Sequence, residues 1–151
     1  MNILEWITAI ASTATAIGVL IAVFQLWHSE KLAATEFEDQ LRRDYRELCA
    51  QLPVNAFLGE ELTTEELEES LSEFHQYFHL CNSQIFLRAQ GRISAATWQM
   101  WSRGVAANFE LPAFRQAWEF INQRATSHRL EYLSRFMNGG QLDPRIEGRI
   151  Q

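Results

Sequence analysis

The sequence predicts an all-α protein: one N-terminal transmembrane helix that continues into a stalk, followed by a small cytoplasmic helical bundle. Three observations support this fold class. The 151-residue chain begins with a long uncharged segment, apolar residues recur at helical spacing in the remainder, and strand-like alternation is nowhere sustained. The predicted organisation is a transmembrane anchor (1–28), a helical stalk (29–53), a cytoplasmic helical domain (54–138) and a flexible tail (139–151).

The uncharged segment runs from Trp6 to Trp27 and is 22 residues long. A helix of this length covers about 31 Å, close to the thickness of the hydrocarbon core of a bilayer. The two tryptophans are expected at the membrane–water interfaces, where an apolar ring with a polar N–H group is favoured. Residues 1–5 contain no basic side chain, which argues against a cleaved signal peptide. The segment therefore predicts a single membrane span with an aromatic anchor at each end.

The basic residues near the span all follow it. Because cytoplasmic flanks are enriched in Lys and Arg, the N-terminus is expected outside and the C-terminal domain in the cytoplasm. Cys49 and Cys81 are then expected as free thiols in a reducing compartment. The basic residues that orient the span are Lys31, Arg42, Arg43 and Arg46.

Small and hydroxyl-bearing residues gather on one face of the predicted span. Ala14, Gly18 and Ala22 follow one another at intervals of four, and large apolar residues occupy the opposite face. Small residues let two membrane helices approach closely, and hydroxyl groups can bond across the contact. We therefore expect a homo-oligomer formed through this face; in an alternative interpretation, several copies surround a pore. The predicted packing face consists of Thr8, Ala11, Ser12, Ala14, Thr15, Gly18 and Ala22.

Two long helices are predicted after the span. The stalk carries one apolar stripe, and Pro53 is expected to end it. Thr63 and Glu66 have the spacing of a capping box, and apolar residues then recur at helical intervals as far as Ile85. One continuous helix is therefore expected from Thr63 to a stop at Gly91. The stripe of the stalk consists of Phe37, Leu41, Tyr45, Leu48 and Leu52.

Three further helices complete the predicted bundle. Ser94 is expected to cap the first, Pro112 to be the first residue of the second, and Gly139 to follow the third. The polar tail contains Ile146-Glu147-Gly148-Arg149, which spells the recognition sequence of a common processing protease. Because it matches a processing site, this stretch carries no prediction about the fold.

The net charge and its distribution constrain the partners. A net charge of −6 argues against nucleic acid. Residues 60–73 hold seven acidic and no basic residues, whereas residues 88–135 hold seven arginines against three acidic residues. The two sets are expected to compensate each other, within a subunit or between copies. Alternatively, arginines surround an anionic ligand such as a nucleotide or an acidic headgroup, since guanidinium matches phosphate geometry. The residues considered for that site are Arg88, Arg92, Arg103, Arg124 and His128.

Few residues suggest catalysis, so no catalytic residue, metal or cofactor is predicted. His75 and His79 share a helix face at a spacing of four, but no third metal ligand accompanies them. Arg124 and His128 form a pairing that suits phosphodiester cleavage. The pairing is similar to, but more closely spaced than, the Arg-and-His signature of helical HEPN ribonucleases. This resemblance implies a membrane-tethered ribonuclease as one alternative function.

Polar and aromatic residues around the centre of the chain have structural and functional interpretations. Asn82, Ser83 and Gln84 are expected to anchor the turn from Arg88 to Ser94, because buried amides need partners. Trp98 and Trp101 are expected to pack in the core. In the alternative interpretation they wall a ligand pocket with Arg92 and Arg103 at its rim.

A series of motifs in residues 77–118 carries a family resemblance. The motifs are Tyr77-Phe78-His79-Leu80-Cys81-Asn82, Arg88-x-x-Gly91-Arg92-Ile93-Ser94, Thr97-Trp98-x-x-Trp101, Leu111-Pro112-Ala113-Phe114 and Trp118. The series resembles a group of uncharacterised bacterial membrane-anchored proteins, which have one span and a helical cytoplasmic domain of unknown function. The resemblance implies a helical fold and the bacterial inner membrane, and it supplies no catalytic residues. The arrangement also resembles membrane effectors of bacterial antiphage systems.

These observations favour a non-enzymatic, membrane-anchored helical module that self-associates through its span. Its expected partners are the lipid bilayer, further copies of the chain, and a cytoplasmic protein or small anionic ligand. The first alternative is an oligomeric effector of a bacterial defence system that permeabilises the membrane. The second alternative is the membrane-tethered ribonuclease.

Overall fold

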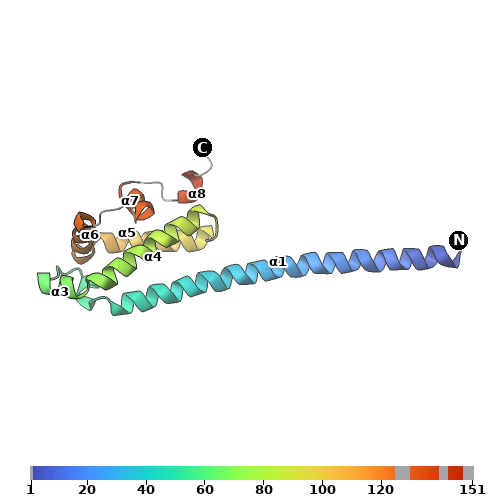
Figure 1. Ribbon diagram of the computed structural model, residues 1–151, viewed down its shortest axis with the longest axis horizontal. Coiled ribbons are helices and arrows are strands. Elements are labelled where there is room, and N and C mark those ends of the chain that lie inside the picture. Colours follow the sequence, from blue (N-terminus) through green and yellow to red (C-terminus); the bar gives the residue numbers. More distant parts are fainter. Residues whose placement is uncertain (1, 125–129, 140–142, 148–151) are drawn as a thin grey trace. The chain divides into compact units, whose positions relative to one another are not determined.

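The computed structural model contains helices and no strand within the residues that it describes, which are 2–124, 130–139 and 143–147 (Figure 1). The predicted all-α fold is therefore confirmed. The chain divides into two compact units, Met1–Asp39 and Gln40–Gln151. The helices are α1 (Ile3–Gln51), α2 (Val54–Phe57), α3 (Thr64–Glu69), α4 (Leu71–Ala89), α5 (Ala95–Glu110), α6 (Pro112–Arg124), α7 (Glu131–Met137) and α8 (Pro144–Glu147).

The first unit is formed by the N-terminal part of α1. Its helix is uninterrupted, since the first proline of the chain, Pro53, lies beyond the end of α1 at Gln51. Every side chain from Ala11 to Phe37 is exposed. Nothing in the described part of the chain therefore covers the apolar residues of this segment.

The last part of α1 belongs to the second unit, which begins at Gln40 within the predicted stalk. Leu41 and Leu52 are buried in the core of this unit, and Tyr45 and Cys49 pack against it. Part of the apolar stripe of the predicted stalk therefore packs into the helical bundle, whereas its first member, Phe37, is exposed in the first unit.

The central helix of the second unit is α4. Helices α3, α6, α7 and α8 pack against α4, and α5 packs against α6; Figure 1 shows α7 and α8 beside α4. The core is aromatic. The ring centroids of Phe78 and Trp118 lie 5.2 Å apart, those of Phe74 and Phe114 lie 5.3 Å apart, and both pairs meet edge to face. This arrangement places the positive edge of one ring on the negative face of the other.

Three predicted helix starts are confirmed. The Thr63 hydroxyl accepts a hydrogen bond from the Glu66 N–H at 3.3 Å, and the Glu66 carboxylate accepts one from the Thr63 N–H at 2.8 Å, which completes the capping box. Ser94 caps α5 by accepting a hydrogen bond from the Thr97 N–H at 3.2 Å. Pro112 is the first residue of α6, where its missing N–H costs no intrahelical hydrogen bond.

The single helix predicted from Thr63 to Gly91 is wrong, because the chain breaks at Ser70 into α3 and α4. Ser70 has φ −99° and ψ 8°, and its hydroxyl donates to the carbonyl oxygen of Glu66 at 2.6 Å. A serine that bonds back to the preceding turn competes with the helical pattern and bends the helix. The predicted stop is confirmed, since α4 ends at Ala89 and Gly91 adopts a positive φ of 73°.

Candidate functional site

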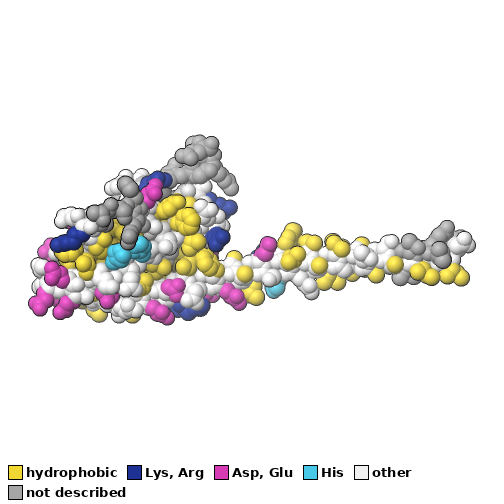
Figure 2. Space-filling model, in the orientation of Figure 1, with side chains coloured by type: hydrophobic (Ala, Val, Ile, Leu, Met, Phe, Trp, Pro, Cys, Tyr) yellow, Lys and Arg dark blue, Asp and Glu magenta, His cyan; other side chains and the backbone are white. Residues whose placement is uncertain are grey.

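Among the residues that the structure describes, one helix is long and apolar enough to cross a membrane. The qualifying segment is Ala11–Gln51, and none of its most apolar stretch is buried, in contrast to a core helix of a soluble protein. Figure 2 shows hydrophobic side chains along the N-terminal part of α1, and acidic and histidine side chains appear only nearer the second unit's end of the helix. Trp6 and Trp27 are exposed by 55% and 67%. The two predicted interface anchors are therefore accessible to a surrounding medium.

The small-residue face of α1 is sterically open. A Cβ atom added to Gly18 would meet no atom within 4 Å, and all members of the face from Ala11 to Ala22 are exposed. The Thr15 hydroxyl donates to the carbonyl oxygen of Ala11 at 2.9 Å, so its proton has a partner within the same helix. Its oxygen can still accept a hydrogen bond across a helix contact. The side chain of Thr8 lies outside the described residues.

Arg88 is buried, so it is not available to an external ligand. Its Nε donates to Oδ1 of Asp143 at 2.8 Å, its Nη2 donates to the other carboxylate oxygen, and its Nη1 donates to the Ile93 carbonyl oxygen at 2.7 Å. The hydrogen bonds from Arg88 hold the pKa of Asp143 below its usual value. Because a buried charge needs such compensation, Arg88 acts as a structural residue. Asp143, which lies within the predicted tail, is thus bonded to Arg88 of α4.

The other described candidate residues of the anion site do not line one common hollow. Arg92, Arg103 and Arg124 are exposed. Arg103 and Trp98 line a hollow of about 510 Å³, whereas Arg124 lines a different hollow of about 450 Å³. Arg92 lines neither hollow. His128 lies outside the described residues, so the structure gives no geometry for its pairing with Arg124.

The central polar and aromatic residues have mainly structural roles. Trp98 is buried and meets Phe136 edge to face with ring centroids 5.9 Å apart, whereas Trp101 is half-buried. The prediction for Asn82 is wrong. Its side-chain oxygen accepts a hydrogen bond from the N–H of Leu133 at 3.1 Å and so satisfies a free donor in the first turn of α7.

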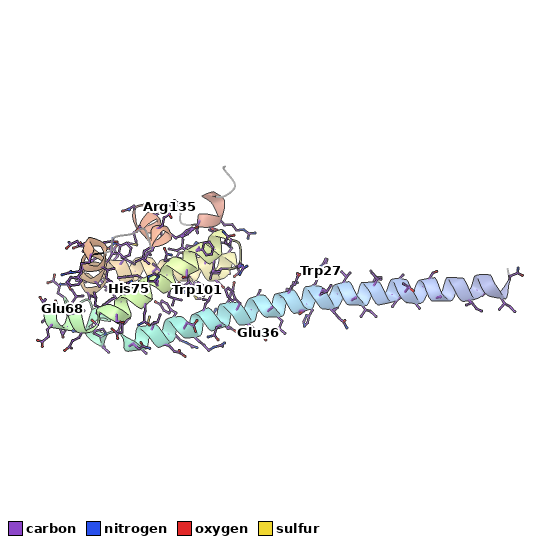
Figure 3. All side chains as sticks on the ribbon, viewed as in Figure 1. Trp27, Glu36, Glu68, His75, Trp101 and Arg135 are labelled. Carbon is purple, nitrogen blue, oxygen red and sulfur yellow. The ribbon has the colours of Figure 1, made fainter. Side chains whose placement is uncertain are left out.

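The acidic and basic regions are not joined by an ion pair within the part of the chain that the structure describes. Among the described residues, no ion pair connects residues 60–73 with the arginines of residues 88–135. Figure 2 shows acidic side chains gathered over α3, and Figure 3 shows Glu68 there and Arg135 on α7. Arg135 instead pairs with Glu131 of its own helix at 2.9 Å. Compensation between copies stays a prediction.

A buried polar cluster was not predicted from the sequence. The Asn108 side-chain amide donates to the hydroxyl of Tyr77 at 2.8 Å and to that of Tyr45 at 3.2 Å. Burial raises the pKa of Tyr45 to about 12 and that of Cys81 to about 12. Cys49 and Cys81 are both free. Because these phenol and thiol groups are protonated at neutral pH, the cluster offers no activated nucleophile.

The histidine pair lies at the surface of α4, where Figure 3 labels His75. The ring centroids of His75 and His79 are 4.5 Å apart. In the part of the chain that the structure describes, no group of three or more His, Cys, Asp and Glu residues is placed to hold a metal ion. His75 lines the same hollow as Arg124.

No family model, no curated protein and no solved structure matches the chain.

Proposed function

We propose that this protein is a single-pass, membrane-anchored helical module that self-associates through its span and binds a cytoplasmic partner. The observation that carries the proposal is the uncharged segment from Trp6 to Trp27, whose described side chains are all exposed. Exposure of apolar surface to water costs about 25 cal/mol per Å², and a bilayer removes this cost. The proposed location is the bacterial inner membrane, with the N-terminus outside, because Lys31 and several arginines follow the span.

Self-association is supported by the open face around Gly18. In lipid there is no hydrophobic force between helices, so contacts form where small residues allow close packing of the two backbones. Gly18 meets no atom within 4 Å of an added Cβ, and Ala14 and Ala22 lie one turn away on either side. A second copy of the same face would meet this surface without steric hindrance.

The second unit is proposed to bind the partner because its surface is hollowed. Two hollows lined by described residues measure about 510 and 450 Å³, within the size range of small-ligand sites.

The membrane proposal is tested by fractionating cells that produce the full chain. The chain is expected in the membrane fraction and is expected to stay there after alkaline carbonate extraction, which releases peripheral proteins. Recovery of the full chain from a detergent-free supernatant would overturn the anchor.

Self-association is tested by chemical cross-linking in membranes. Gly18→Leu is expected to reduce the cross-linked dimer and higher species at least about tenfold, since a bulky side chain separates the backbones. Ala16→Leu is the matched control, because Ala16 lies on the opposite face of the span and its substitution should leave the pattern unchanged. Equal effects of both substitutions would contradict an interface through Gly18.

A membrane-permeabilising effector is the rival function, and the same variants distinguish it. Such an effector collapses the membrane potential when its expression is induced, which a potential-sensitive dye reports. The proposed module leaves the potential unchanged. If the wild type and Ala16→Leu both collapse the membrane potential and Gly18→Leu does not, the rival function replaces the proposal.

A further inference from the structure

We propose that the hollow between α4 and α6 binds a phosphate monoester that carries a small apolar group. This inference goes beyond the proposed function, because it assigns a site and a ligand class to the second unit. The hollow has a volume of about 450 Å³. Its lining residues are Leu71, Ser72, His75, Phe120, Ile121 and Arg124.

The two helices build the hollow in the same way. Helix α4 contributes residues 71, 72 and 75, and helix α6 contributes residues 120, 121 and 124. Positions separated by three and by four residues share a helix face, as 72 and 75 or 71 and 75 do, so each helix turns one face to the hollow. Leu71, Phe120 and Ile121 supply apolar surface, while Ser72, His75 and Arg124 supply hydrogen-bond donors.

Arg124 is held in an orientation that suits an oxyanion. Its guanidinium carbon lies 3.5 Å from the centre of the Phe120 ring. A guanidinium that stacks on a ring keeps the N–H groups in its own plane, where they match two oxygens of a phosphate. Among the described residues Arg124 has no carboxylate partner. The positive charge of Arg124 also interacts favourably with the negative C-terminal end of the α6 dipole. That interaction does not depend on the neighbouring hollow.

Two further donors come from α4. The Ser72 oxygen accepts a hydrogen bond from the Gln76 side chain at 3.4 Å, which leaves the hydroxyl proton for a ligand. His75 is exposed and packs edge to face against the ring of His79, which fixes one side of its imidazole. The three donors and the apolar surface together match a phosphate joined to a small apolar group.

The surrounding charge favours a small ligand over a polymer. Residues 60–73, which include α3, hold seven acidic residues and no basic one. Such a cluster repels an extended polyanion such as nucleic acid, whereas a single phosphate needs only the donors within the hollow. The ligand is therefore a phosphate monoester, supplied either by a soluble metabolite or by a lipid headgroup.

The proposal is tested with the full chain in nonionic micelles, using phenyl phosphate as the probe. Binding is followed by NMR chemical-shift changes of the histidine ring protons. Saturable binding in the millimolar range or tighter is expected, with inorganic phosphate at least about threefold weaker because it lacks the apolar group. Absence of saturation at about 10 mM phenyl phosphate, or equal affinity for both probes, would overturn the proposal.

Substitutions then locate the site. Arg124→Gln is expected to weaken phenyl phosphate binding about tenfold, and Ser72→Ala to weaken it by a smaller factor. Arg115→Gln is the matched control, since Arg115 is an exposed arginine of the same helix that does not line the hollow. A similar loss for Arg115→Gln, or no loss for Arg124→Gln, would refute the assignment. Circular dichroism checks that the variants fold; if Arg124→Gln does not, Ser72→Ala decides the outcome.

A final arm identifies the source of the phosphate. Phenyl phosphate binding is measured again in nanodiscs that contain phosphatidic acid. A lower affinity there, caused by competition from the phosphatidic acid headgroup, would assign the site to a lipid headgroup. Unchanged affinity in these nanodiscs would assign it to a soluble monoester. Both results support the shared chemistry, and neither depends on self-association of the span.

Discussion

Arg88 and Asp143 are 55 residues apart in the sequence and are joined by two parallel hydrogen bonds. A third hydrogen bond from Arg88 to the Ile93 carbonyl oxygen holds the guanidinium against the turn after α4. Arg145 lies over the same turn, since a Cβ added to Gly91 would lie 3.2 Å from its guanidinium carbon. The C-terminal residues around Asp143 are therefore part of the helical bundle.

Removal of the carboxylate is expected to destabilise the second unit. Asp143→Ala leaves the buried Arg88 charge without its partner. We expect a loss of about 2 kcal/mol, below the roughly 3–5 kcal/mol for a fully buried pair, because the Asp143 side chain is 26% exposed. Urea unfolding of the full chain in micelles measures the loss. Glu131→Ala, which breaks the exposed pair with Arg135, is the control and should cost less than about 1 kcal/mol.

The same ion pair predicts a dependence of stability on pH. Hydrogen bonds from Arg88 lower the pKa of Asp143 from its ordinary value of 3.8. The folded state thus favours the carboxylate, so its stabilising effect is complete above about pH 5 and declines as the pH falls through the folded-state pKa. The difference in unfolding free energy between wild type and Asp143→Asn should shrink below about pH 4. A difference that stays constant or grows in acid would contradict this.

The capping box of α3 is expected to contribute measurably to stability. Thr63→Ala removes the hydroxyl that accepts from the Glu66 N–H and should cost about 1 kcal/mol. Thr64→Ala is a matched control, because Thr64 is the first residue within the helix and makes no cap. Chemical unfolding measures both variants, and a larger loss for Thr64→Ala would exclude the capping role.

The two thiols are expected to react slowly in the folded chain. Burial raises the pKa of Cys81 to about 12, and it also raises the pKa of Cys49, which is only half-buried. Since the thiolate is the reactive form, alkylation by iodoacetamide at pH 8 should be slow until urea unfolds the chain. The variants Cys49→Ala and Cys81→Ala separate the two rates. Cys81 should be the slower thiol, and equal rapid labelling of both would contradict its burial.

The features predicted correctly from the sequence depend on chemistry within a single turn. The capping box of Thr63 and Glu66, the Ser94 cap and the position of Pro112 each involve residues at most three positions apart. Such interactions leave a local pattern that sequence inspection detects. The uncharged segment from Trp6 to Trp27 is likewise contiguous, so the sequence alone indicates the candidate span.

Features that depend on distant residues could not be predicted. Asp143 and Asn82 are ordinary polar residues in the sequence, and only the fold reveals their contacts with Arg88 and Leu133. The break at Ser70 is hidden in the sequence for a different reason. The apolar period continues through the break, so periodicity alone does not reveal a serine that bends the helix.

The candidate ligand site was only partly evident from the sequence. The sequence indicates Arg124 as an anion contact and His75 as a possible metal ligand, and it gives no indication for Ser72. The three residues come from two helices, so their proximity depends on the packing of α4 against α6. The spacing of Phe120 and Arg124, four residues apart on one helix, was a local indication of the stacked guanidinium.

The hydrogen bond between Asn82 and Leu133 makes α7 dependent on α4 for its formation. Helix α7 is only seven residues long, and no side chain of its own N-cap residue, Leu130, accepts a hydrogen bond. A helix this short does not persist in isolation. We therefore expect residues 131–137 to become helical only when they pack against α4, and their amide protons to exchange with deuterium when that long-range contact opens.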